Sequence, residues 1–187
     1  MTTDDAPRGR TAGGPAGVAL VAIVYLVWTV VTTWPLTARL GSGVPSDLGD
    51  PLLVSWFLWW DAHVVPLTDQ WWNAPMFFPT RGVMAFSEHF LGTAALVSPI
   101  VWLTGNLQLA YNVAFLLTFV LSALAAYALC FMIVRRHDAA FVAGLAFGFA
   151  PYRWSQLSHL HVLSVYWMPV ALLALHRYFE DRRGRWL

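Results

Sequence analysis

Asp50 and Glu88 are the acidic side chains whose sequence surroundings best suit a chemical role. Asp50 lies in a Gly-Asp-Pro turn, and Glu88 lies in a Ser-Glu-His sequence. A carboxylate held in this way can act as a general base or bind a divalent metal ion, so both are candidate catalytic residues. The alternative for Asp50 is a cap on the following helix, because Asp is favoured at the N-cap and Pro at the first helical position. Capping, by Glu88 or by Ser87, is likewise the alternative for the second acid.

Two histidines later in the chain could complete a metal site with these acids. His159 and His161 are separated by one residue in a segment that also holds Ser and Gln. Imidazole and carboxylate groups together bind divalent ions, in a geometry that folding rather than local spacing would set. We therefore predict a divalent metal cofactor, of unknown identity, with four ligands: Asp50, Glu88, His159 and His161. Interface histidines without a ligand are the alternative.

The composition of the chain indicates where these side chains work. Hydrophobic residues make up 58% of the 187 residues and charged residues only 11%, against about 25% in soluble domains. Together with a mean hydropathy of +0.58, this predicts an all-α integral membrane protein whose first partner is the lipid bilayer. Arginines cluster at residues 8–10, 135–136 and 177–185. Such clusters are a signal for membrane orientation and not for a nucleic-acid partner.

Four apolar runs are predicted to cross the membrane, at residues 17–37, 107–134, 138–151 and 162–179. The third has only about 14 apolar residues against the roughly 20 that a span needs. Its Gly144 and Gly148 have the small-xxx-small spacing that permits close helix packing. If the three arginine clusters are all cytoplasmic, an even number of spans separates each pair, which agrees with four spans.

With an even number of spans between the arginine clusters, the chain is predicted to have a cytoplasmic polar N-terminus at 1–16 and a membrane domain at 17–187. The domain has one large outer loop at 38–106 and a second at 152–161. Two juxtamembrane helices are predicted in the large loop, at about 51–63 and 88–104.

Aromatic and acidic residues of the large loop are expected at its surface. Tryptophan is enriched at membrane interfaces, so an anchoring role is predicted for Trp56, Trp59, Trp60, Trp71 and Trp72. Asp47 and Asp61 are expected to be solvated or to cap helices.

Arginine is uncommon on the outer side of a membrane protein, which makes Arg153 and Arg81 candidates for a specific role. A guanidinium can bind a phosphate group through two parallel hydrogen bonds. We predict that both residues contribute to phosphate binding. The alternatives for Arg153 are a helix cap and a snorkelling residue at the interface.

Several short motifs recur in one order along the chain: Gly49-Asp50 before a Trp-rich helix, Trp72-Asn73-Ala74-Pro75, Phe78-Pro79, Ser87-Glu88-His89, Gly105-Asn106, Ala110-Tyr111-Asn112 and Pro151-Tyr152-Arg153 with Gln156 and His159. This order resembles the N-terminal module of bacterial multi-spanning glycosyltransferases of the GT-C fold, closest to the YfhO-like and lipid-linked-sugar transferases. The resemblance covers nearly all of residues 17–187.

The resemblance implies an enzyme that transfers a sugar from a polyprenyl-phosphate donor to an acceptor on the outer side of the bacterial cytoplasmic membrane. It implies that Asp50 serves the acceptor or a divalent metal, that Glu88 is a second acid, and that Arg153 lies near the donor phosphate. Many relatives have an adjacent acidic pair where this chain has only Asp50. They are also much longer, so the chain is expected to be incomplete at its C-terminus and to need further spans or a second membrane subunit.

The alternative function is a non-catalytic membrane module that binds a lipid-linked sugar or assembles with a partner subunit. A transporter is disfavoured, because no predicted span carries a charged residue at its centre. The sequence has no phosphate-cradling Gly-rich loop, Ser/His/Asp triad spacing or zinc-binding helix motif. Its single cysteine, Cys130, excludes an intrachain disulfide.

Overall fold

The computed structural model describes residues 15–181, which form helices and connecting loops without a strand. In chain order the elements are α1 (Pro15–Thr32), η1 (Leu36–Arg39), α2 (Asp50–His63), α3 (Asp69–Trp72), η2 (Val83–Ala85), α4 (Leu91–Thr104), α5 (Leu107–Val134), α6 (His137–Gly148), α7 (Pro151–Trp154), α8 (Leu160–Leu163) and α9 (Trp167–Asp181). The prediction of an all-helical chain is confirmed for these residues.

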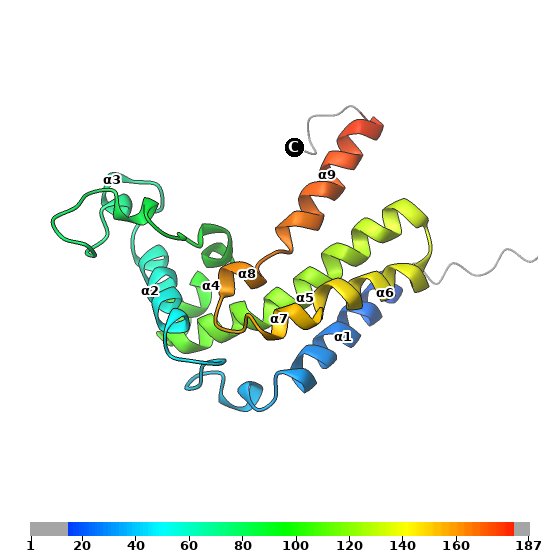
Figure 1. The fold of residues 1–187 in the computed structure, drawn as a ribbon, viewed down its shortest axis with the longest axis horizontal. Helices are drawn as coiled ribbons and strands as arrows, with labels where there is room; N and C mark the ends of the chain where they lie inside the picture. Colours follow the sequence, from blue (N-terminus) through cyan, green and yellow to red (C-terminus); the bar gives the residue numbers. More distant parts are fainter. Residues whose placement is uncertain (1–14, 182–187) are drawn as a thin grey trace, which may run out of the picture.

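Helix α5 is the element on which the others pack. It contacts α1, α2, α4, α6, α8 and α9, and its 28 residues extend over about 42 Å. It begins where the side chain of Asn106 accepts a hydrogen bond from the backbone N–H of Leu109 at 2.9 Å. Figure 1 shows α2, α3 and α4 grouped at one end of α5, with α1 and α6 along the rest of it and α9 diverging from it.

Within residues 15–181, three helical segments are long and apolar enough to cross a membrane: Pro15–Thr32, Leu107–Val134 and Leu160–Glu180. They match three of the four predicted spans. The first ends five residues earlier than predicted, because Pro35 follows and residues 36–39 turn into a 3-10 helix. The remaining predicted span, 138–151, is the 12-residue helix α6, which extends over only about 18 Å, against about 30 Å of hydrocarbon.

Two glycines allow α6 to lie directly against α5 and α1, as the small-xxx-small spacing predicted. A Cβ added at Gly148 would lie 2.6 Å from the Cβ of Ala123 on α5. One added at Gly144 would overlap the hydroxyl group of Tyr25 on α1 and would lie 2.7 Å from the carbonyl oxygen of Ala123. That hydroxyl donates a hydrogen bond to the carbonyl oxygen of Phe141 at 2.9 Å, so the close approach also joins α1 to α6.

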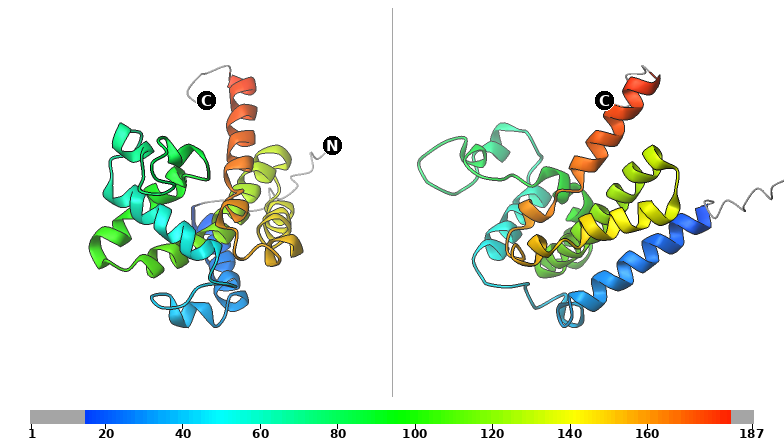
Figure 2. Two further views of the ribbon diagram at one scale, coloured as in Figure 1. Left: turned by 60° about the vertical axis from the view of Figure 1, so that its left-hand side comes forward. Right: turned by 45° about the vertical axis from the view of Figure 1, so that its right-hand side comes forward.

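The two predicted juxtamembrane helices are present as α2 and α4, which pack on each other and on the first half of α5. Their shared core contains Phe57 and Leu58 from α2, Val97 from α4 and Phe115 from α5, all with almost no exposed surface. Figure 2 shows from two further sides that this group stands beside the long helices as a separate layer. The helices of the large loop therefore share one core with the first half of α5.

Trp71 and Trp60 belong to this core, which corrects their predicted role as interface anchors. Trp71 is completely buried, and the indole N–H of Trp60 donates to the carbonyl oxygen of Trp71 at 2.9 Å. Burial of an indole ring removes a large apolar surface from water and so stabilises the fold. Such burial needs neighbouring side chains from several helices, and a short stretch of sequence does not show which helices these are. Trp59, in contrast, keeps part of its ring exposed.

Candidate functional site

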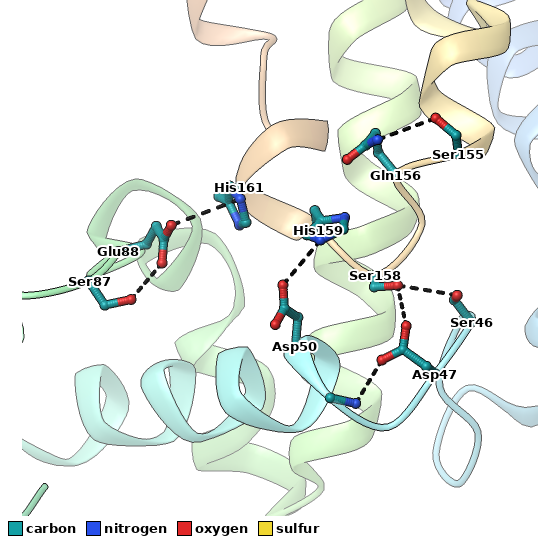
Figure 3. Close-up of polar contacts among 11 residues, drawn as sticks. Ser46, Asp47, Asp50, Ser87, Glu88, Ser155, Gln156, Ser158, His159 and His161 are labelled. Atoms are coloured by element: carbon teal, nitrogen blue, oxygen red, sulfur yellow. Dashed lines mark hydrogen bonds and ion pairs between the residues drawn. The ribbon is translucent and has the colours of Figure 1, made fainter.

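Two pairs of a carboxylate and a histidine lie next to each other at the start of α8. The Oδ2 atom of Asp50 is 3.5 Å from Nε2 of His159, and Oε1 of Glu88 is 3.9 Å from Nε2 of His161. The two imidazole rings are 5.7 Å apart and nearly perpendicular. Figure 3 shows that the acids come from separate segments, while both histidines come from the short stretch that begins α8. The fold thus brings together all four residues that were predicted to act at one site.

Asp50 is the first residue of α2 and does not cap it. Gly49 occupies the N-cap position without a side-chain hydrogen bond, so the capping alternative for Asp50 is wrong. A negative side chain is stabilised in the first turn of a helix by the unpaired backbone N–H groups there. The carboxylate is 43% exposed, and the imidazole of His159 is 41% exposed. Both side chains of this pair are therefore partly exposed at the protein surface.

Glu88 also does not cap a helix, because α4 begins at Leu91 and has Phe90 in a left-handed conformation at its N-cap. The hydroxyl of Ser87 donates to Oε2 of Glu88 at 2.7 Å. This bond is the main reason why the pKa of Glu88 is lowered, and the backbone N–H of Glu88 and the nearby His161 add to the effect. Glu88 is therefore an ionised acceptor at neutral pH.

Polar contacts beside the Asp50 pair hold together the two loops that were predicted to lie on the outer side, at residues 38–106 and 152–161. The hydroxyl of Ser158 lies 2.6 Å from Oδ2 of Asp47 and 3.2 Å from the hydroxyl of Ser46, as Figure 3 shows. The other oxygen of Asp47 accepts from the backbone N–H of Gly49 at 2.8 Å. These hydrogen bonds lower the pKa of Asp47, and the bond from Ser158 has the largest effect. Asp47 is thus a positioning residue for the turn that carries Asp50, a role that the sequence did not indicate.

A cavity of about 400 Å³ opens beside the second pair. Trp167 closes part of it next to Gly92, and its polar side chains are those of Ser87, Glu88, His89, Thr93, His161 and Ser164. A Cβ added at Gly92 would lie 3.3 Å from the indole of Trp167, so the glycine keeps this corner open. The cavity has room for a small polar group next to both an acid and a histidine.

The predicted metal ligands are close but do not surround one point. Within residues 15–181, no group of three or more His, Cys, Asp or Glu side chains is arranged to hold a metal ion. Each acid faces its own histidine instead. The donor set therefore does not fit a single divalent ion, and the chemistry of the site is argued below from the side chains alone.

Arg153 lies beneath α8, where it is only 4% exposed. Its Nη2 atom donates to the carbonyl oxygen of Leu163 at 3.1 Å and to the hydroxyl of Thr118 at 3.3 Å. The guanidinium is 4.7 Å from the centre of the Phe119 ring, a cation–π distance. Burial lowers the pKa of Arg153 to about 10, which leaves it cationic at neutral pH. A buried group of this kind is not a snorkelling interface residue.

Arg81 does not join Arg153. Its side chain is 82% exposed and lies 3.8 Å from Asp69, an equally exposed acid. The segment between α3 and η2, which carries Arg81, extends away from α7 and α8 (Figures 1 and 2). The two arginines that were predicted to bind phosphate therefore lie in different parts of the fold.

Asp61 is buried in the core between α2 and α3, which corrects its predicted solvated or capping role. It is 5% exposed, and its Oδ1 accepts a hydrogen bond from the indole N–H of Trp71 at 2.6 Å. Its Oδ2 has no partner among the described residues. Burial raises the pKa of Asp61 to about 6, although the bond from Trp71 acts in the opposite direction.

Two asparagines near the start of α5 position the first outer loop and were not identified as functional residues from the sequence. The amide of Asn112 donates to the carbonyl oxygens of Leu40 and Gly43, both at 2.7 Å. The side-chain amide of Asn106 donates to the carbonyl oxygen of Gly41 at 3.1 Å. An asparagine inside a long apolar helix is the signal that could have revealed this clamp, because polar groups are costly in a membrane unless they have partners.

Comparisons with family models, with characterised proteins and with solved structures found no significant match to this chain. The functional assignment therefore depends on the geometry of the two acid–histidine pairs and on the membrane setting of the helices that carry them.

Proposed function

We propose that this protein is a glycosyltransferase of the bacterial cytoplasmic membrane that takes a sugar from a polyprenyl-phosphate donor on the outer face. The N-terminus is cytoplasmic in this proposal. The observation that carries it is the pairing of Asp50 with His159, because a carboxylate at the membrane surface next to an imidazole suits the activation of a hydroxyl group. The motif order that resembles GT-C transferases supplies the substrate class.

In the proposed reaction Asp50 is the general base. An acceptor hydroxyl gives its proton to the Asp50 carboxylate as its oxygen forms a bond to the anomeric carbon of the donor sugar. The bond between that carbon and the phosphate oxygen breaks, and the polyprenyl phosphate leaves with the electron pair. His159 contacts the Asp50 oxygen that lies 3.5 Å away and holds the carboxylate toward the acceptor.

Glu88 and His161 form the second polar contact surface of the same site. Glu88 is ionised and accepts from Ser87, so it can accept a further hydrogen bond from a sugar hydroxyl in the neighbouring cavity of about 400 Å³. Aromatic rings such as Trp167 at the cavity edge suit the apolar face of a sugar. In this proposal Glu88 orients the substrate while Asp50 takes the proton.

The proposal is tested with the protein reconstituted in lipid vesicles, together with any membrane subunit that copurifies with it. A panel of polyprenyl-phosphate sugars serves as donors and a cell-envelope fraction as acceptor, and mass spectrometry measures the release of free polyprenyl phosphate. We expect release with one donor class. Asp50→Asn should lower the rate at least about a hundredfold, the usual range for loss of a general base.

Asp69→Asn is the matched control, because Asp69 is an exposed acid on the segment near Arg81 and should leave the rate unchanged. Full activity of Asp50→Asn would remove Asp50 from the catalytic role. Binding of a lipid-linked sugar without any turnover by the wild-type protein would instead identify a non-catalytic binding module.

A further inference from the structure

A cavity of about 430 Å³ lies where α1 ends. Its walls are the end of α1, η1, the loop between η1 and α2, and parts of α5 and of the segment around α7. None of the four side chains of the two acid–histidine pairs lines it. A cavity of this size with mostly apolar walls and few polar groups has the form of a ligand site. The larger apolar side chains that line it are those of Trp34, Pro35, Leu36, Phe115, Trp154 and Leu157.

Arg39 is the one charged residue among the described residues that line this cavity, which we call the Arg39 cavity. It is exposed, and no carboxylate in residues 15–181 lies within ion-pair distance of its guanidinium. The hydroxyl groups of the lining already have partners. Those of Thr32 and Thr33 donate to backbone carbonyl oxygens of the preceding turn, and that of Ser46 accepts from Ser158. The guanidinium is therefore the group that can bind an anionic ligand here.

The Arg39 cavity lies at the level of the lipid head groups when α1 spans a membrane. Helix α1 is long and apolar enough to do so and ends at Thr32, and the cavity is built at and beyond this end. Trp34, which lines it, is 66% exposed, and tryptophan is enriched at this level of a membrane. A guanidinium binds a phosphate group through parallel hydrogen bonds. The phosphate and the apolar part of an anionic lipid therefore both find a matching surface in the cavity.

The shape of the cavity favours the head-group end of a glycerophospholipid. It has room for about 14 groups of the size of a water molecule, at roughly 30 Å³ each, which is enough for a phosphate, a glycerol unit and the first acyl carbons. It does not continue along α5, because Phe115 is the one residue of that helix that lines it. The acyl chains would instead follow α1, where the half-exposed Trp28 lies one turn before Thr32 on the same side of the helix.

We infer that the Arg39 cavity binds an anionic glycerophospholipid. Its phosphate contacts Arg39, and its glycerol unit and first acyl carbons lie against Trp34 and Phe115. The site is separate from the two acid–histidine pairs, at which the proposed transfer reaction takes place. The lipid is therefore a structural ligand and not a substrate.

A lipid in the Arg39 cavity would contact both of the segments that meet beside Asp50. Ser46 and Leu157 line the cavity, and they directly precede the two partners of the 2.6 Å hydrogen bond between Asp47 and Ser158. Figure 3 shows this bond next to the start of α2. The bound lipid should therefore stabilise the contact between the two segments, and with it the turn that carries Asp50.

Photolabelling tests the site in the whole protein. The protein is placed in phosphatidylcholine nanodiscs with a small fraction of phosphatidylglycerol that carries a diazirine on an early acyl carbon. A phosphatidylcholine with the same diazirine is the reference lipid. After illumination, mass spectrometry compares the labelling of residues 33–46 with that of residues 168–175, a part of α9 with exposed apolar side chains. We expect this ratio to be roughly fivefold higher with phosphatidylglycerol, the effect of one arginine at an anionic surface.

Two variants that each remove one positive charge test the contact with Arg39. Arg39→Gln should lower the ratio for phosphatidylglycerol to that for phosphatidylcholine. Arg81→Gln changes an arginine that is 82% exposed and does not line the cavity, and it should keep the full ratio. No preference in the wild type, a preference that persists in Arg39→Gln, or an equal loss in both variants would overturn the inference.

Competition identifies the source of the phosphate. Unlabelled phosphatidylglycerol should displace the label from residues 33–46, whereas glycerol 3-phosphate at the same concentration should not, because it has no apolar part. Displacement by glycerol 3-phosphate, or by a polyprenyl phosphate at a lower concentration than phosphatidylglycerol requires, would contradict a phospholipid site. The labelling needs no turnover, and Asp50→Asn should be labelled like the wild type, so that failure of this inference is distinct from failure of the transferase proposal.

Discussion

Asp50 and His159 lie with Oδ2 and Nε2 3.5 Å apart, although one begins α2 and the other precedes α8. The contact joins the two loops that were predicted to lie on the outer side, and the hydrogen bond between Ser158 and Asp47 lies beside it. Each residue therefore has its position fixed by the loop that carries the other.

This relationship predicts that His159 acts through Asp50. Asp50→Asn should remove most transfer activity, and His159→Gln should lower it by a smaller factor. The double variant should be no slower than Asp50→Asn alone, because the imidazole has no role once the base is absent. The measurement is a double-mutant cycle: the rate of polyprenyl phosphate release is compared among the wild type, the two single variants and the double variant. His63→Gln is the control, since His63 lies at the other end of α2, next to the backbone carbonyl oxygen and the indole ring of Trp59. Multiplicative effects in the double variant would contradict the coupling.

Asn112 should prove essential for the conformation of the first outer loop. Asn112→Leu keeps the approximate size of the side chain but leaves the carbonyl oxygens of Leu40 and Gly43 without their donor. The expected loss of stability is about 2 kcal/mol or more. Trypsin should cut the variant faster after the exposed Arg39, which lies next to the clamped residues. Cleavage after Arg81, on a loop that Asn112 does not contact, is the internal reference and should stay constant.

Gly148→Ala should separate α6 from α5. The added methyl group would lie 2.6 Å from the Cβ of Ala123, and overlap of this kind usually costs about 1 to 3 kcal/mol. Elsewhere in a helix the same substitution stabilises by up to about 1 kcal/mol. Thermal unfolding in detergent should show a lower midpoint for Gly148→Ala. Val142→Ala, on an exposed side of α6, is the control and should change the midpoint little; an unchanged or raised midpoint for Gly148→Ala would refute the close contact.

Asp61 should make stability depend on pH in the acid range. Burial raises the pKa of Asp61 in the folded protein to about 6, above its value of about 3.9 in an unfolded chain. The folded state then holds the proton more tightly, so this contribution is present below pH 4 and is lost as the pH rises through 6. The difference in unfolding free energy between wild type and Asp61→Asn should fall by about 3 kcal/mol over that range. Denaturant titrations at several pH values measure it, and a difference that does not vary with pH would contradict the buried carboxyl.

Local patterns were sufficient to predict the longer helices and the packing glycines, but not the single-turn helices α3, α7 and α8. The helix at 107–134 and the helix after Gly49 appear where apolar runs and turn residues indicated, because these signals act within a few residues. The same patterns did not predict the environments of Asp61 and Trp71. Trp71 belongs to a core that also contains residues of α4 and α5, and Asp61 is buried next to Trp71. A single sequence without alignment does not reveal which segments meet.

For the candidate site, the sequence likewise predicted the residues but not their arrangement. Asp50, Glu88, His159 and His161 were selected for their side-chain chemistry, and the fold brings them together in pairs. Their pairing, and the absence of a common metal position within residues 15–181, depend on how α8 meets the first outer loop. Arg153 was selected because a cation is rare on the outer side, whereas its burial under Phe119 and Leu163 depends on the contact of α7 with α5.

Helix α8 is a single turn with a different partner on each side. His161 faces Glu88, and the carbonyl oxygen of Leu163 accepts from Arg153. A single helical turn is too short to bend, so a displacement on one side moves the other side by a similar amount. A ligand that binds between Glu88 and His161 and shifts α8 would therefore also change the hydrogen bond between Arg153 and Leu163. A substitution at Arg153 would then change the affinity for that ligand through the same coupling free energy.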